Sequence, residues 1–341
     1  MNDAIGVITA GGVNITVRPK IPTPHALALL ETAGAIPRLD SAQAQLAEGE
    51  SLWDLISRWY CSEVEDVLRR DLVRDYRTTR DILRVARGHI DAPRTVASIM
   101  RGTLSVHCEV QEFDADNPAN RMLLAGLRAV STSPRTPPST AARAARAARR
   151  FDGVGPLNAG DFRSAKPRVR HYTSALVLAR HILTSTARHL DNGAAPAWAF
   201  LLRTPEAIEE GMRRTVQAAL PQHQVTKSAR RLPPSTKTLN PDLVMDAGRA
   251  VGDVKYKIHS GEWNNSDLYQ VVAFATGYRA NHAAVLTFAR KGRHEALTPL
   301  HVGGVRVTHL CWPADPDISP RQAADAFEAD VRDWAQSTQS P

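Results

Sequence analysis

The stretch that decides the fold is NPDLVMDAGRAVGDVKYKI, residues 240–258. Two short runs rich in apolar side chains flank the turn-forming sequence Asp-Ala-Gly-Arg at 246–249, and this pattern predicts a β-hairpin. If the two central residues of that sequence form the loop, Asp242 lies directly opposite Asp253 on the partner strand. Directly opposed residues have Cβ atoms about 4.5–5.5 Å apart, and like charges at that distance repel each other. We therefore expect a cation to neutralise the two carboxylates.

Lys255 and Glu209 extend this carboxylate pair to a candidate catalytic centre. Lys255 lies two residues after Asp253, so its ammonium is on the same face of the strand and can stabilise charge that develops on a phosphate. Glu209 belongs to a helix predicted before the hairpin and can complete a metal shell. Mg²⁺ prefers carboxylate and water oxygens and leaves positions for a substrate phosphate. These residues predict metal-assisted phosphodiester hydrolysis with Mg²⁺ or Mn²⁺.

Helices are predicted on both sides of the hairpin. Thr204 followed by proline is typical of a helix start, and the apolar spacing carries this helix to about residue 220. Its predicted buried stripe consists of Ile208, Met212 and Val216. Ser266 is predicted to cap a second helix, and a third is predicted over 319–336.

The N-terminal half carries less recognisable chemistry. Its predicted elements are a β-hairpin turning at 11–12, helical structure over 40–86, a strand over 102–112, and helices over 117–130 and 172–189. We expect an α/β (α+β) chain with two domains, a mixed β and helical adaptor over 1–165 and a domain with a central mixed sheet flanked by helices over 166–341.

Charge favours a polyanionic partner. The chain has 341 residues, is 43% hydrophobic and carries a formal net charge of +8. Such an excess attracts nucleic acid. Ten Lys or Arg and only two Asp fall between 128 and 170. There Arg143, Arg146 and Arg150 share one helical face, which predicts either a DNA-binding helix or a solvated linker.

Several classes of protein are excluded. No run approaches the roughly 20 apolar residues that a membrane span needs, so we expect a cytoplasmic chain without a membrane partner. The three cysteines are far apart, which disfavours a disulfide framework and a zinc site. No phosphate-binding GxxxxGK[ST] loop occurs, so any nucleotide hydrolysis must come from another subunit.

The order of motifs resembles a known nuclease family. Pro241-Asp242 followed by Asp253-Val254-Lys255 resembles the PD-(D/E)xK pattern, and Gln270 with Phe274 resembles its QxxxY element, with phenylalanine in place of tyrosine. The whole arrangement resembles the McrC family, the nuclease subunit of McrBC-type modification-dependent restriction systems. The further elements that carry this resemblance are Pro19-Lys20-Ile21, Arg87-Gly88-His89-Ile90, Asn120-Arg121, Tyr256-Lys257 and Asp267-Leu268-Tyr269.

The resemblance implies a fold, an activity and a partner. It implies a PD-(D/E)xK nuclease domain in the second half. The catalytic residues that it implies are Asp242, Asp253, Lys255, Glu209 and Gln270. Glu209 is a further metal ligand by this resemblance, although the Phe-Glu pair of the family reads Ile208-Glu209 here. The implied substrate is modified DNA, and the implied partner is a ring-forming AAA+ GTPase of the McrB type. We expect the ring contact in the arginine-rich region 58–94, at Arg74, Arg77 and Arg87.

Two other functions stay open on the sequence alone. One is a RecB-like nuclease of DNA repair or recombination with the same core. The other is a DNA-binding adaptor that has kept the scaffold without the catalysis. The paired carboxylates and the lysine disfavour the adaptor, because a protein without catalysis has no need for them.

Overall fold

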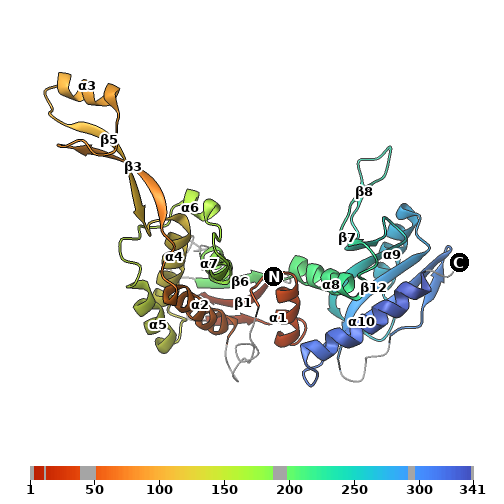
Figure 1. Cartoon of the computed structure of the whole chain (residues 1–341). Helices are drawn as coiled ribbons and strands as arrows, with labels where there is room; N and C mark the ends of the chain where they lie inside the picture. Colours follow the sequence, from red (N-terminus) through yellow and green to blue (C-terminus); the bar gives the residue numbers. More distant parts are fainter. Residues whose placement is uncertain (1–3, 11–12, 39–50, 187–197, 291–295, 339–341) are drawn as a thin grey trace. The chain divides into compact units, whose positions relative to one another are not determined.

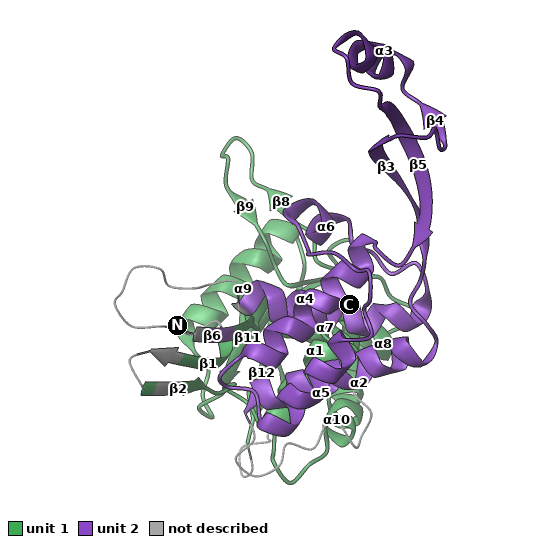
Figure 2. Ribbon diagram, turned by 90° about the vertical axis from the view of Figure 1, so that its left-hand side faces the viewer, with its two compact units in different colours: residues 1–48, 201–341 green, residues 49–200 purple. Residues whose placement is uncertain are grey.

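The chain forms two compact units (Figure 2). One contains residues 1–48 and 201–341, and the other contains residues 49–200. The computed structural model describes residues 4–10, 13–38, 51–186, 198–290 and 296–338. These bounds differ from the predicted division at residue 165, because the N-terminal segment packs with the C-terminal part of the chain. The division into an adaptor and a nuclease part stays a prediction.

A six-stranded mixed sheet organises the first unit. Its strand order is β13-β14-β12-β11-β10-β7. The three central strands β11, β12 and β14 run parallel, and the outer strands pair antiparallel. The bounds are Val225–Thr226 (β7), Leu243–Met245 (β10), Ala250–Ile258 (β11), His282–Ala289 (β12), Leu300–Val302 (β13) and Val305–Pro313 (β14). This confirms the predicted mixed sheet.

Helices cover both faces of this sheet (Figure 1). The helices α1 (Thr23–Thr32), α8 (Pro205–Ala219) and α10 (Pro320–Ser337) share one core with the sheet, and α9 (Asn265–Tyr278) packs on the opposite face. The predicted stripe of α8 is confirmed, because all three of its members are fully buried. The backbones of α1 and α8 approach so closely that a Cβ on Gly211 would lie 2.3 Å from the carbonyl oxygen of Leu29.

The N-terminal hairpin is confirmed by its register. The strands β1 (Ala4–Ala10) and β2 (Val13–Val17) pair antiparallel, with Ala10 opposite Val13, and β6 (Trp198–Arg203) extends this sheet in the order β2-β1-β6. The predicted turn at 11–12 lies outside the described residues. A further short pair, β8 (Arg230–Arg231) and β9 (Thr238–Leu239), forms a separate antiparallel ribbon.

Helices form the body of the second unit. They are α2 (Leu52–Arg69), α4 (Pro118–Thr132), α5 (Pro138–Ala148), α6 (Ala159–Ser164), the short helix η1 (Arg170–Tyr172) and α7 (Thr173–Thr186). The predicted helix over 117–130 is confirmed. The predicted helix over 172–189 is confirmed as far as residue 186, and residues 187–189 lie outside the described ranges. Tyr60 of α2 donates a hydrogen bond to the carbonyl of Leu123 and fills the space above Gly126. Among the helices in the described ranges, none is both long and apolar enough to cross a membrane.

An arm extends from these helices within the same unit (Figure 1). It consists of β3 (Asp75–Leu83), β5 (Val106–Asp114) and β4 (His89–Ile90), in the order β3-β5-β4, together with α3 (Ala92–Met100). The predicted helix over 40–86 is therefore wrong beyond about residue 70, where the arginines lie on or beside a strand. The predicted strand over 102–112 is confirmed as β5.

Candidate active site

The β10–β11 hairpin brings two aspartates together. Leu243 pairs with Gly252 and Met245 with Ala250, and this register continues to Asp242, directly opposite Asp253. The predicted opposition is therefore confirmed. The loop differs from the prediction, since the strand pairing ends at 245 and 250 and four residues make the turn. Asp246 and Ala247 both take a positive φ there, which permits the tight reversal.

The two carboxylates are buried. Asp242 is 7% exposed and Asp253 only 3%. The backbone N–H of Val254 donates to Oδ2 of Asp242 at 3.0 Å, which fixes this carboxylate over the hairpin. Burial raises the pKa of Asp253 to about 6, and the neighbouring Asp242 adds to that effect, while the ammonium of Lys255 opposes it. The site therefore holds negative charge at a cost and favours a cation.

Lys255 contacts both the aspartate pair and α9. Its Nζ lies 2.6 Å from Oδ2 of Asp253 and donates to Oε1 of Gln270 at 2.7 Å. Asp267, also on α9, lies 4.0 Å from Lys255 and pairs with Lys257 at 2.5 Å. The helix thus brings Gln270, the first residue of the QxxxY-like element, into contact with Lys255. The predicted cap is wrong by two residues, because Asn264 rather than Ser266 caps α9 by accepting from the N–H of Asp267.

Lys227 completes the cluster and is a residue that sequence reasoning missed. Its Nζ donates to Oε2 of Glu209 and to Oδ1 of Asp242, both at 2.9 Å. Burial lowers the pKa of Lys227, but the two carboxylates outweigh it and the net pKa is raised. Burial is also the largest cause of the raised pKa of Glu209, which Lys227 partly offsets. Lys227 directly follows β7, the strand that pairs with β10, so only that pairing could have identified it.

The donor set suits a divalent cation by its chemistry. Oδ2 of Asp253 is buried and, among the described residues, receives no hydrogen bond, although Lys255 pairs with it electrostatically. No group of three His, Cys, Asp or Glu side chains within the described ranges is already arranged to hold a metal ion. Glu209 and Asp242 instead share the ammonium of Lys227. The carboxylates therefore fit Mg²⁺ or Mn²⁺ only if this ammonium leaves.

A pocket of about 210 Å³ opens beside this cluster. Lys257 and Asp267 line it next to His259, Trp263 and His309. The ring of His309 packs edge-on against those of His259 and Trp263. Burial and the neighbouring His259 lower the pKa of His309 to about 4, so this imidazole is neutral at physiological pH. The pocket adds an aromatic wall of His259, Trp263 and His309 next to the charged site.

The predicted DNA-binding arginines belong to the other unit, where Arg143 and Arg146 lie on α5 and Arg150 follows its end. Arg143 forms two hydrogen bonds of 2.6 Å with Glu65, and Arg150 donates to the carbonyl of Leu68. Arg146 is exposed on the same helix. Two of the three arginines therefore serve packing between α5 and α2, which favours the linker reading of this helix. Their role in DNA binding stays a prediction.

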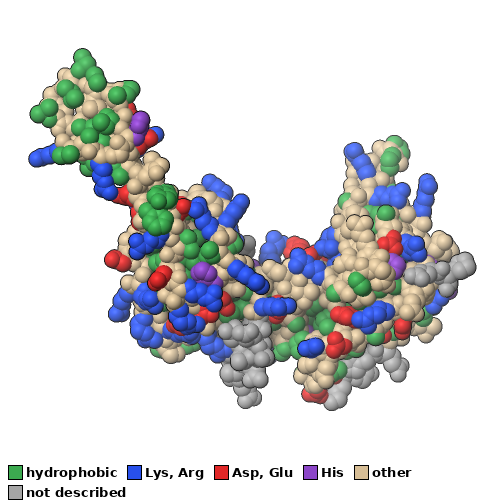
Figure 3. All heavy atoms as spheres, in the orientation of Figure 1, with side chains coloured by type: hydrophobic (Ala, Val, Ile, Leu, Met, Phe, Trp, Pro, Cys, Tyr) green, Lys and Arg blue, Asp and Glu red, His purple; other side chains and the backbone are tan. Residues whose placement is uncertain are grey.

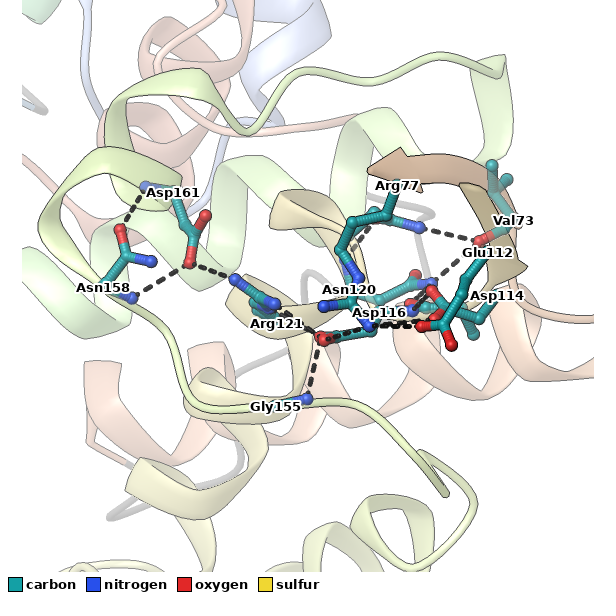
Figure 4. A network of polar contacts seen from close by, with 12 residues as sticks. Val73, Arg77, Glu112, Asp114, Asp116, Asn120, Arg121, Gly155, Asn158 and Asp161 are labelled. Atoms are coloured by element: carbon teal, nitrogen blue, oxygen red, sulfur yellow. Dashed lines mark hydrogen bonds and ion pairs between the residues drawn. The ribbon is translucent and has the colours of Figure 1, made fainter. Parts of the chain in front are cut away.

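The predicted partner-binding arginines lie at the arm. Arg77 lies at the base of the arm between the carboxylates of Glu112 and Asp114, at 3.3 and 3.1 Å (Figure 4). The network continues through Asp116 to Arg121. Arg121 also pairs with Asp161 in the first turn of α6 (Figure 4). The hydrogen bond from Arg121 holds the pKa of Asp116 at about 2. Arg74 and Arg87 are exposed, so Arg77 supports the arm while these two remain accessible.

Comparisons with known proteins show the family of the chain and similar folds. A family model described as "McrBC 5-methylcytosine restriction system component" matches residues 1–289. A chain from a half-complex of the tetradecameric assembly of Thermococcus gammatolerans McrB AAA+ hexamers with bound McrC is similar in fold, with a TM-score of 0.69 and 15% identity over 97% of this chain and 82% of that one. A chain from the McrBC complex of the same organism has a TM-score of 0.52 and 12% identity, over 97% of this chain and 78% of that one. No curated protein sequence matches the chain.

Proposed function

Because this chain belongs to the McrBC 5-methylcytosine restriction system component family, we propose that it is the nuclease subunit of such a system. The observation that carries the proposal is the buried pair Asp242 and Asp253 with Lys255 on the same strand. Two opposed buried carboxylates are unfavourable without a cation, and the raised pKa of Asp253 is the kind of electrostatic perturbation found at functional sites. The reaction we assign is hydrolysis of a phosphodiester bond of DNA.

Three carboxylates of the chain would hold the metal. Asp242, Asp253 and Glu209 supply the oxygen ligands that Mg²⁺ or Mn²⁺ takes, and the bound ion would lower the pKa of a water and neutralise charge on the scissile phosphate. Lys255 points into the same cluster, where its ammonium stabilises the negative charge that grows on the phosphate oxygens. Gln270 accepts a hydrogen bond from this ammonium and so orients it.

Lys227 keeps the site closed to metal. Its ammonium lies between Glu209 and Asp242, at the position where a shared cation would be bound. Its side chain is 45% exposed, so it can rotate into solvent when a divalent cation takes its place. The positive charge then remains next to the carboxylates and can meet the DNA backbone.

An AAA+ GTPase of the McrB type is the partner that we propose, with the arm as its contact. Large apolar side chains are exposed along the arm and its helix: Tyr76, Ile82, Val85, Met100, Leu104 and Phe113. Exposed apolar surface of this kind marks an interaction site in a soluble assembly. The similarity in fold to a chain from the assembly of McrB AAA+ hexamers with bound McrC supports this partner. Arg74 and Arg87 flank this surface and would meet acidic groups of the ring.

Co-purification with an AAA+ GTPase encoded next to this chain tests the proposal. The complex is then incubated with GTP, Mg²⁺ and duplex DNA that is either methylated at cytosine or unmethylated. We expect cleavage of the methylated duplex and none by the chain alone. Cleavage of free ends or branched DNA without GTP would instead favour a repair nuclease.

A further inference from the structure

The β8–β9 hairpin is a basic projection from the first unit. Between Lys227 and Asn240 the chain carries four Lys or Arg and no Asp or Glu. Nearly every residue of this segment is exposed. Figure 3 shows Lys and Arg side chains along the projecting hairpin, which is labelled β8 in Figure 1. Such a concentration of one charge sign attracts a polyanion.

The base of the hairpin is fixed against α9. A Cβ on Gly277 would lie 2.1 Å from the Cδ1 atom of Leu239, so a larger residue would require the Leu239 side chain to move. The hydroxyl of Tyr278 donates to the carbonyl of Ser228 at 2.6 Å. The guanidinium of Arg230 lies over the Tyr278 ring, 5.4 Å from its centroid. These contacts fix the hairpin against α9, and Arg230 makes one of them.

Two cationic side chains of the hairpin, Arg231 and Lys237, have no carboxylate partner among the described residues. Neither Arg231 nor Lys237 forms an ion pair within the part of the chain that the structure describes, and both side chains are exposed. Arg231 lies on β8, opposite Thr238, and Lys237 directly precedes β9 on the other side of the turn. They leave the hairpin with positive charge on both edges.

Both ends of the hairpin enter the candidate active site. Lys227 precedes it and contacts Asp242, which follows it. A strand rises about 3.3 Å per residue, so Arg231 lies within roughly 13 Å of Lys227 along the chain, and Lys237 within roughly 17 Å of Asp242. DNA rises about 3.4 Å per base pair, so these distances correspond to about four or five base pairs.

We propose that the β8–β9 hairpin binds the phosphate backbone of duplex DNA, within about five base pairs of the bond that is cut. This inference rests on the proposed nuclease function. Phosphate contact is expected because Arg231 and Lys237 are exposed cations, and roughly half to two-thirds of protein–DNA hydrogen bonds go to the backbone. Arg231 and Lys237 make the contacts, and Arg230 positions the hairpin.

The test measures the salt dependence of DNA binding by the full chain. The variant Arg231→Gln with Lys237→Gln is compared with the wild type on one fixed duplex, by fluorescence anisotropy without divalent cation. Each lost phosphate contact lowers the slope of log K against log salt by about 0.9, so two lost contacts lower it by about 1.8. The loss of affinity between 50 and 200 mM salt then becomes roughly tenfold smaller than for the wild type.

A matched control removes the same charge elsewhere on the unit. Arg321→Gln with Arg332→Gln changes two exposed arginines of α10, on the opposite face of the sheet from α9. We expect this control to keep the wild-type slope, and melting temperatures show that both variants are folded. A salt slope in the hairpin variant equal to that of the wild type, or a fall of the same size in the control, overturns the proposal.

Failure of the hairpin and failure of the nuclease function are distinguishable. A wild-type chain that binds duplex DNA and cuts it with its partner, while the hairpin variant keeps the full slope, refutes only the hairpin. A reduced slope together with a wild-type complex that never cuts DNA supports the hairpin and refutes the nuclease. A wild-type chain with no affinity for duplex DNA overturns the hairpin contact, and both proposals fail if its complex with the partner also never cuts DNA. Binding of the hairpin to an acidic protein surface instead predicts an unchanged DNA slope.

Discussion

Replacing Lys227 by methionine removes the ammonium from between Glu209 and Asp242 while keeping a side chain of similar length. Two hydrogen bonds of 2.9 Å to charged groups are lost. Such bonds contribute about 1.5–3 kcal/mol each when buried. The Lys227 side chain is 45% exposed, and solvent screening reduces exposed pairs to about 0.2–1 kcal/mol. We therefore expect the metal-free variant to lose about 1–2 kcal/mol of unfolding free energy.

The contacts of Lys227 that stabilise the metal-free protein should weaken metal binding by the same free energy. A divalent cation must displace Lys227 in the wild type but not in the variant, so Mn²⁺ affinity should rise by about 5- to 30-fold. Titration calorimetry with Mn²⁺ measures the affinity, and urea denaturation without metal measures the stability. Lys237→Met is the control, because this lysine has no carboxylate partner among the described residues. Lower stability with unchanged or weaker Mn²⁺ affinity in Lys227→Met would refute the placement of the metal.

Four further changes test other parts of the structure. Lys255→Ala should lower single-turnover cleavage by about 100- to 1000-fold and leave Mn²⁺ affinity intact, and a loss below tenfold would refute its role. Because the pKa of Asp253 is raised to about 6 from 3.8, the folded protein holds an extra proton between these values and its stability falls as pH rises through them. Asp253→Asn should abolish that decline in metal-free urea denaturation, so a variant that is less stable than the wild type at pH 7 would contradict this account. Arg143→Gln should cost about 1 kcal/mol of stability, because it breaks the pair with Glu65, and leave the salt slope of DNA binding unchanged; a flatter slope would restore its role in DNA binding. Arg77→Ala should loosen the arm and reduce stimulation of the partner's GTP turnover, and full stimulation would separate the arm from that function.

The second half of the chain was largely predictable because its signals are local. The register of the hairpin follows from the turn sequence and the alternation around it, and it placed Asp242 opposite Asp253. The buried stripe of α8 follows from helical spacing. The helix that carries Gln270 was predicted, but its cap was assigned to Ser266 instead of Asn264, and the contact of Gln270 with Lys255 was not predicted. The mixed sheet follows from the same elements.

The features that the sequence did not predict depend on long-range packing, or belong to exposed elements that have no buried face. No residue of β3 is buried, and its half-buried face carries the polar residues Asp75, Arg77 and Thr79, so the strand has no apolar period and its arginines look like a helical stripe. The union of residues 1–48 with the C-terminal part depends on contacts such as that of Leu29 with Gly211, which no local pattern encodes. Lys227 belongs to the site only because β7 pairs with β10.

The most direct test of the central claim compares DNA cleavage by the wild type and by Asp253→Asn, each assembled with the AAA+ GTPase partner. Methylated duplex DNA is incubated with GTP and Mg²⁺, and the partner's GTP turnover is measured in the same samples. We predict cleavage by the wild type and none by the variant, with equal GTP turnover in both, because the carboxylate serves the metal and not the ring. Equal cleavage by both proteins would show that the aspartate pair is not the catalytic centre.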